Sequence, residues 1–379
     1  MKKSINDNIL IILLILAIIF FTLSYFNSSL AINDGNKDRE FDYIFDPTDY
    51  IGSEEKSKDT NDSLNEENND SKNIINEKRE NEPSINTGSN LAEKLDDENS
   101  RYNFIATGDW YCNEETKKTI NNILTRQPEL IITTGDQVKE SPSAACWIKM
   151  SEPIKDKMKI AIGNHDAEFA NIYKQIVNYH QLKSPYYSHD FKNIHFLSMS
   201  TEHPFEIGSK QYEFIKNDLE KTSNNSSIDW IVVHHHKPLY STSQDKLEAE
   251  QLRDTYQQLF QQYDVDLVIS SHNQYYERTY PILYNEQYEK NTNKKVEPKP
   301  IVTNHSINEY SDKDGIIFLT VGTAGDELDP VKEKHRYYVI QDSKFGFLNV
   351  NLENNGKTLV GQFHTNTGQI IDQFRLNKS

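Results

Sequence analysis

Residues 159–166 read KIAIGNHD, a short apolar stretch that ends in GNHD at residues 163–166. The apolar part predicts a β-strand over residues 159–162, and the glycine after it allows the backbone to turn sharply. The carboxyl end of a strand is where α/β sheets present their functional side chains. This segment therefore predicts a site that contains Asn164 and His165 at one edge of a sheet.

Four other apolar segments also end in polar residues. Two of them end in a Gly-Asp pair, and the other two run into histidines. Because the carboxyl ends of parallel strands meet at one edge of a sheet, we expect these side chains to lie close together. Carboxylate and amide oxygens combined with imidazole nitrogens favour Zn, Mn or Fe. The residues are Gly108-Asp109, Gly135-Asp136, His234-His235-His236 and Ser271-His272.

From residue 101 onward, short apolar runs alternate with amphipathic helical patterns, and after about residue 310 the pattern is mostly strands. This order predicts an α/β protein, or more closely an α+β sandwich, in which two mixed β-sheets are flanked by helices. The predicted strands cover residues 102–107, 130–134, 159–162, 194–198, 230–234, 267–270, 316–321, 345–351, 359–363 and 370–374. The predicted helices cover residues 116–124, 168–180, 210–221 and 247–260.

The N-terminal segment contains the most apolar part of the chain. Residues 9–26 read ILIILLILAIIFFTLSYF, which is just long enough to span a bilayer core of roughly 30 Å. Lys2 and Lys3 precede this run, so the positive-inside rule predicts a single-pass cell-membrane protein whose remainder is extracellular. A signal peptide cleaved after the small residues SLA at 29–31 is the alternative, and the protein would then be secreted.

Residues 31–100 carry most of the acidity. They hold 20 acidic and 8 basic side chains, against a net charge of −17 for all 379 residues. A segment so rich in charge and so poor in apolar groups cannot bury enough surface to offset the entropy of ordering it. We therefore expect a disordered acidic stalk between a membrane anchor or signal segment at residues 1–30 and a folded domain at residues 101–379.

The charge and the cysteine content exclude two other classes of protein. No segment has the strong basic excess that binds phosphate backbones, so nucleic acid is not an expected partner. Two cysteines cannot form a disulfide-rich scaffold, so residues 101–379 must fold around an apolar core. Cys112 follows the first Gly-Asp turn, and Cys146 lies in the loop expected after the second strand. We expect a disulfide between them in an exported domain, and two unrelated core residues are the alternative.

The order of the motifs resembles that of the calcineurin-like metallophosphoesterases. The chain runs Gly-Asp, Gly-Asp, Gly-Asn-His-Asp, His-x-Pro-x-Tyr and His-x-x-x-Tyr-Glu-Arg-Thr over about residues 101–350. It is most similar to the purple acid phosphatases within that family, because YERTYP at residues 276–281 and VGTAG at residues 321–325 resemble that branch. The resemblance implies two metal ions that clamp a phosphate ester and activate a hydroxide.

The resemblance also implies a role for each polar residue. Asp136 would bridge the two ions, and Asp109 would bind the first one. His165 would act on the phosphate or the leaving oxygen from outside the metal shell. His235 neighbours a ligand on its strand and would pack behind the metal or modify the site. The ligands of the second ion would be completed by Asn164, His236 and His272.

The chain departs from the family pattern at the first ion. Family members supply a His two residues after the first Asp or a Tyr three residues after the second, and here those positions hold Tyr111 and Lys139. Gln274 replaces a later histidine, so its amide oxygen would be a weak ligand. The Lys139 ammonium either fills the space of the first ion or turns to solvent. We expect one tightly bound Fe, Zn or Mn ion, and the binding of a second ion stays open.

Two classes of function follow from this pattern. The chain is expected to hydrolyse phosphate esters as an acid-phosphatase-like phosphomonoesterase outside the cell membrane, with two metal ions or with one. The alternative is a catalytically weak or inactive pseudo-phosphoesterase that serves as a surface binding module. Hydrolysis of an aryl phosphate in the presence of added Zn, Mn or Fe distinguishes the two.

Overall fold

The structure is a computed structural model that describes residues 102–139, 143–241, 246–291 and 297–379. The membrane segment and the acidic stalk expected within residues 1–100 lie outside these ranges. Within them, no helix has both the length and the apolar character that a bilayer crossing requires.

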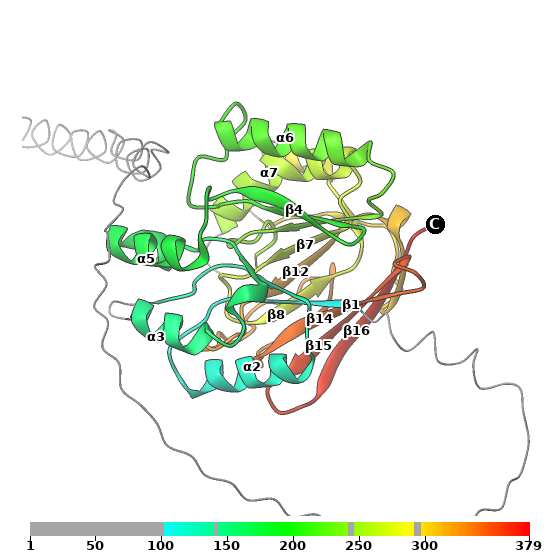
Figure 1. Ribbon diagram of the computed structural model, residues 1–379. Helices are drawn as coiled ribbons and strands as arrows, with labels where there is room; N and C mark the ends of the chain where they lie inside the picture. Colours follow the sequence, from blue (N-terminus) through cyan, green and yellow to red (C-terminus); the bar gives the residue numbers. More distant parts are fainter. Residues whose placement is uncertain (1–101, 140–142, 242–245, 292–296) are drawn as a thin grey trace, which may run out of the picture. The chain divides into compact units, whose positions relative to one another are not determined.

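The first of two large sheets contains both the earliest and the last strands (Figure 1). Its three earliest strands are parallel and lie together at one edge, and the C-terminal strands beside them are antiparallel, so the sheet is mixed. In spatial order its strands are β11 (Glu309–Ser311), β16 (Ile370–Asn377), β15 (Thr358–Thr365), β14 (Gly346–Glu353), β1 (Tyr102–Thr107), β2 (Leu130–Thr133) and β3 (Met158–Ile160).

The second large sheet contains the middle of the described chain. Four neighbouring strands are parallel, and antiparallel strands flank them on both sides. In spatial order its strands are β13 (Tyr338–Asp342), β8 (Tyr276–Thr279), β12 (Ile317–Val321), β7 (Leu267–Ser270), β6 (Trp230–His234), β5 (Ile194–Ser198) and β4 (Tyr187–Phe191). A small pair, β9 (Ile282–Leu283) with β10 (Ile301–Val302), lies apart from both sheets.

Helices cover the outer faces of the two sheets (Figure 1). Helix α2 (Glu114–Thr125) lies on the first sheet, and α6 (Lys210–Ser223) and α7 (Lys246–Gln262) lie on the second. The side chains of Asn113 and Ser209 accept hydrogen bonds from the first turns of α2 and α6, which sets where these helices begin. The shorter helical elements are α3 (Ser143–Ser151), η1 (Lys155–Lys157), α4 (Asn164–Glu168), α5 (Ala170–His180), α8 (Glu286–Glu289) and η2 (Asp312–Asp314).

The apolar core lies between the two sheets. Phe104 and Ala106 of β1 point into it from the first sheet, and Phe196 of β5 and Val232 of β6 point into it from the second. The Phe104 and Phe196 rings meet edge to face, with their centroids 5.1 Å apart. Side chains alternate along each strand, so the opposite face of each sheet packs on the helices. The polar turns that follow the strands lie at the edge of this core.

The predicted fold class of two mixed sheets flanked by helices is confirmed. Every predicted strand and helix is present, with ends shifted by at most a few residues. The prediction missed α3, β4, β8 and β13 and the short elements. Strand β8 contains Glu277 and Arg278, both fully buried, which no apolar pattern reveals. Arg278 is stable there because Asp372 of β16 pairs with it at 2.6 Å.

Candidate metal centre

Five strand ends bring the predicted side chains together. β1, β2 and β7 are followed by residues with positive φ, namely Asp109 at 56°, Asp136 at 48° and His272 at 68°. Residues other than glycine rarely adopt this left-handed conformation, and such strain is concentrated at functional sites. β3 leads into α4, whose first residue is Asn164, and β6 leads into His236.

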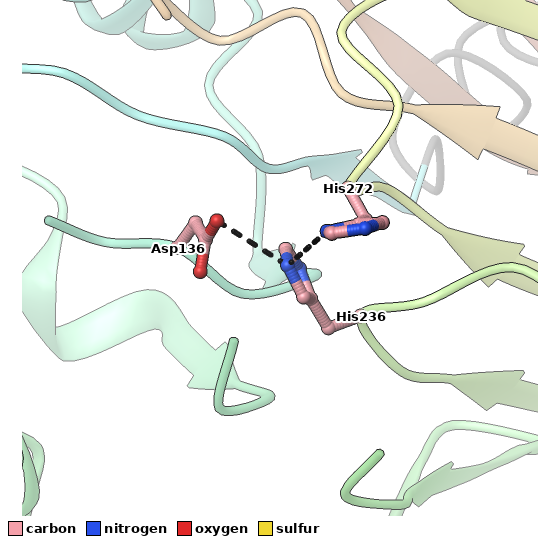
Figure 2. Close-up of side chains that lie close together, drawn as sticks. All are labelled: Asp136, His236 and His272. Carbon is pink, nitrogen blue, oxygen red and sulfur yellow. Dashed lines mark hydrogen bonds and ion pairs between the residues drawn. The ribbon is translucent and has the colours of Figure 1, made fainter. Parts of the chain in front are cut away.

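The side chain of His236 is at the centre of the group (Figure 2). Its Nε2 atom lies 2.9 Å from Oδ1 of Asn164. The same atom lies 3.2 Å from Nδ1 of His272 and 3.3 Å from Oδ2 of Asp136. One atom each of Asp136, His236 and His272 lies within 4.8 Å of the others, so these three form a candidate cation site among the described residues.

These four side chains fit a metal ion. Two ligand atoms that are each about 2.1 Å from a Zn ion lie about 3.0 to 3.4 Å from each other in common geometries, and the contacts of His236 Nε2, at 2.9 to 3.3 Å, are close to this spacing. One carboxylate, one amide oxygen and two imidazoles also match the preference of Zn, Mn and Fe. The predicted ligand set of the second ion is therefore assembled in one place.

The chain fixes which nitrogen of His236 faces the centre. Its Nδ1 atom lies 3.0 Å from the carbonyl oxygen of Thr134 and 3.1 Å from Oγ of Ser271, so Nε2 is left for a metal. Burial would lower the pKa of His236, but Asp136 beside it raises this pKa to about 10. A metal ion has to displace that proton, so metal affinity is expected to rise with pH.

Asp136 is held from two sides. Its Oδ1 atom accepts a hydrogen bond from the backbone N–H of His165 at 3.0 Å. Burial would raise the pKa of Asp136, but His236 lowers it below its usual value and keeps the carboxylate ionised. A side chain at Gly163 would collide with the Asp136 carboxylate, so glycine is required there for a steric reason.

Asp109 lies on the side of the centre assigned to the first ion. Its Oδ2 atom accepts from the backbone N–H of His272 at 2.8 Å, and its Oδ1 atom accepts from Nε2 of Gln274 at 3.2 Å. Burial raises the pKa of Asp109 to about 7, against the opposing effect of His236. Positive charge placed beside Asp109 would lower this pKa, so this side of the centre favours a cation.

His165 lies at the rim. Its side chain is 31% exposed, and its Nδ1 atom lies 3.4 Å from a carboxylate oxygen of Glu168 on the same helix. The ring is thus accessible to a substrate, as its predicted role requires. The backbone N–H of His165 also helps to position Asp136, because it donates a hydrogen bond to that carboxylate.

Lys139 has a partner that the sequence analysis did not consider. Its Nζ atom pairs with both carboxylate oxygens of Asp326, at 2.8 and 2.7 Å. The sequence analysis missed Asp326, although this residue directly follows the glycine-rich VGTAG segment. Lys139 is therefore held by a carboxylate rather than turned freely to solvent.

Three other predicted residues have more limited roles. Gln274 is a hydrogen-bond donor to Asp109. His235 is fully buried, and burial lowers its pKa to about 3, so its ring is a neutral packing group. Tyr111 is partly buried, and its backbone N–H donates to Oγ1 of Thr116 at 3.1 Å.

Cys112 and Cys146 form a disulfide, with their Cα atoms 6.1 Å apart. It joins the turn after β1 to α3. The prediction that Cys146 lies in a loop is wrong, because residues 143–151 form a helix. Trp147 of this helix packs on Trp110, with ring centroids 5.1 Å apart, so the helix has an apolar reason to form there.

Residues 102–276 match the family model of the calcineurin-like phosphoesterases. The chain is 29% identical over 201 residues to "Probable inactive purple acid phosphatase 24" of Arabidopsis thaliana, which covers 51% of this chain and 30% of the relative. It is 26% identical over 194 residues to "Purple acid phosphatase 22" of the same plant, covering 46% and 44%. The predicted resemblance to the calcineurin-like phosphoesterases and their purple acid phosphatases is confirmed.

A solved structure supports the fold. The purple acid phosphatase PPD1 from yellow lupin (Lupinus luteus) seeds superposes with a TM-score of 0.61 and 21% identity, over 74% of this chain and 54% of that one. The chain spans less than half the length of the two Arabidopsis relatives. One of these relatives is named as probably inactive, and the other is named simply as a purple acid phosphatase.

Proposed function

We propose that this protein is a metal-dependent hydrolase of phosphate esters, an acid-phosphatase-like phosphomonoesterase. The observation that carries the proposal is the convergence of Asp136, Asn164 and His272 on Nε2 of His236, at 2.9 to 3.3 Å. The match to the calcineurin-like phosphoesterases supports phosphate esters as the substrate class. One tightly held Fe, Zn or Mn ion is the proposed cofactor.

Each residue has a separate task in this proposal. Asp136, Asn164, His236 and His272 would hold the ion, which supplies Lewis acidity and an activated water when it is bound. His165 is accessible at the rim and donates a hydrogen bond to the phosphate or a proton to the leaving oxygen. The buried hydrogen bonds of His236 and Asp136 keep the ligands in place before substrate binds.

The experiment is hydrolysis of an aryl phosphate monoester by the purified full-length chain with added Zn, Mn or Fe. We expect a metal-dependent rate that falls by about 10²- to 10⁴-fold in His165→Ala, the loss typical of a general acid. His236→Ala should lose both metal and rate. His305→Ala, a change of an exposed histidine outside the centre, is the matched control and should keep the rate.

An inactive binding module is the second candidate. It is favoured by the "Probable inactive" names of several relatives and by Lys139 and Gln274 at the first-ion position. In that case the chain would bind the metal, yet the rate would stay flat with every metal. Metal content and rate are therefore measured on the same preparation.

We also propose that the domain faces the outside of the cell membrane, anchored by residues 9–26 or secreted after cleavage near residues 29–31. The apolar run and the lysines before it support export. A disulfide is typical of an oxidising compartment, so the Cys112–Cys146 bridge supports it too. Protease treatment of intact cells should degrade the domain, and protection of the domain would contradict export.

A further inference from the structure

The first-ion side of the centre contains an ion pair between Lys139 and Asp326, and the two side chains differ in how exposed they are. The Lys139 side chain is 34% exposed, whereas that of Asp326 is 7% exposed. Both carboxylate oxygens of Asp326 contact the ammonium. A two-pronged contact with a buried carboxylate restricts an ammonium more than a single contact between two exposed side chains does.

Asp326 is fixed beside Asp109 by backbone contacts. The backbone N–H groups of Gly325 and Asp326 both donate to the carbonyl oxygen of Asp109, at 3.1 and 2.9 Å. A side chain at Gly325 would collide with Thr116 of α2, so this loop lies tightly against the helix. The backbone N–H of Glu327 also donates to Oδ1 of Asp326 at 2.8 Å. These contacts keep the ion pair next to the centre.

The residues at the first-ion position do not fit a second metal ion. Asp109 lacks beside it the histidine or tyrosine donors that the family supplies at this position, and its two oxygens accept hydrogen bonds from His272 and Gln274 instead. Gln274 stands where the family supplies a histidine, and its neutral amide donates to Asp109 in place of an imidazole that would bind a metal ion. Lys139 stands where the family supplies a tyrosine, and an ammonium repels a metal ion.

We propose that the Lys139 ammonium, held by Asp326, replaces the first metal ion, so that the centre binds one metal ion and Lys139 contacts an oxygen of the phosphate. This inference rests on the proposed function, because it assigns the phosphate-binding cation of the same site. An ammonium has three N–H donors, and the two oxygens of Asp326 account for two of them. Among the described residues no partner is recorded for the third, so it can bind a phosphate oxygen, which lysine binds as a point charge.

Metal stoichiometry is the first test. The full-length chain, loaded with Zn²⁺ or Mn²⁺ and dialysed, should hold one ion per chain by elemental analysis. Lys139→Ala should bind a second ion at least about 10-fold more tightly than the wild type, because a like charge is removed. Lys139→Tyr combined with Gln274→His restores the family's donors and should hold two ions. Two ions in the wild type, or an unchanged second-ion affinity in a folded Lys139→Ala, would overturn the proposal.

Binding of inorganic phosphate to the metal-loaded chain is the second test. Lys139→Met should raise the Kd by about 10-fold or more, which is the loss of one charge-assisted hydrogen bond. Lys139→Arg should keep most of the affinity, because it keeps the charge. Lys357→Met, which breaks the exposed Lys357–Asp229 ion pair, is the matched control and should leave the Kd unchanged. An equal Kd in Lys139→Met and the wild type would contradict the inference.

Hydrolysis is scored separately, so the two proposals can fail independently. One ion and Lys139-dependent phosphate binding without hydrolysis would retain the inference and reject the hydrolase. Hydrolysis by a chain that holds two ions would do the reverse.

Discussion

The Asp166 carboxylate accepts a hydrogen bond from the backbone N–H of Gln137 at 2.8 Å. Its Oδ1 atom also accepts from Val138 at 3.2 Å, and its Oδ2 atom accepts from Gly163 at 3.0 Å. Asp166 is fully buried, and burial raises its pKa well above the usual value. One side chain therefore ties the turn after β2 to the turn after β3, and these turns carry Asp136 and Asn164.

We predict that Asp166→Asn destabilises the protein and weakens the metal site together. The amide replaces one acceptor oxygen by a donor, so at least one buried backbone N–H loses its partner. The free energy of unfolding should fall by about 2 kcal/mol. Metal affinity should fall by about 10-fold, as for other groups that orient ligands. Denaturant unfolding and metal titration measure both, and equal values in Asp166→Asn and the exposed control Asp156→Asn would contradict the prediction.

The Cys112–Cys146 disulfide should contribute substantially to stability. It joins residues that are 34 positions apart in the sequence. Closing a loop of that length removes entropy from the unfolded chain and raises the free energy of unfolding by about 3.8 kcal/mol in the chain-entropy model. The denaturant midpoint should therefore fall when a reductant is added. The double variant Cys112→Ser/Cys146→Ser should be less stable at the start and insensitive to the reductant; a midpoint that does not respond in the wild type counts against the prediction.

Acid should destabilise the protein partly through His189. Burial lowers its pKa to about 4, below the value of about 6.5 in an unfolded chain. The unfolded state therefore takes up this proton first, so stability is full above about pH 6.5 and is lost as the pH falls toward 4. His189 stacks on Phe196, so His189→Phe keeps the packing without the titration.

The measurement for His189 is the denaturant midpoint between pH 7 and pH 4. His189→Phe should lose about 1 kcal/mol less stability over this range than the wild type. His305→Phe changes an exposed histidine and serves as the control. Parallel curves for the wild type and His189→Phe would rule out this contribution.

The contribution of His195 to stability should depend on pH in the opposite direction to that of His189. Its two ring nitrogens contact Asp190 at 2.6 Å and Asp218 at 2.8 Å. Burial would lower its pKa, but these two carboxylates raise it above 6.5. Its contribution to stability is therefore fully present below about pH 6.5 and is lost as the pH rises through the folded pKa.

The matching variant is His195→Gln, which keeps a donor but does not titrate. We expect it to be less stable than the wild type by about 1 kcal/mol at pH 6, with a difference that shrinks toward pH 9. Thermal unfolding across this pH range measures the difference. A difference that stays constant with pH would show that the ion pairs contribute nothing.

Much of the fold could be predicted because its strands are apolar runs that end at polar residues or glycine. β1, β5, β6 and β7 have the predicted ends. β8 could not be predicted in this way, because the partner that makes buried Arg278 tolerable is Asp372, 94 residues away in the sequence. Local patterns report which residues prefer burial, but they do not report ion pairs made across the sheets.

In the candidate site, too, some features could be predicted from the sequence and others could not. The type and order of the residues in Gly108-Asp109, Gly135-Asp136 and residues 163–166 were sufficient to predict a metal-binding edge, because ligand chemistry is a property of the side chains themselves. The pairing of Lys139 with Asp326 was not predictable, because 187 residues separate them and only the loop packed against α2 brings them together. The sequence alone determined the donor chemistry and the strand ends. The tertiary structure decided which charge each of these groups meets, because electrostatic partners depend on distance in space and not on position along the chain.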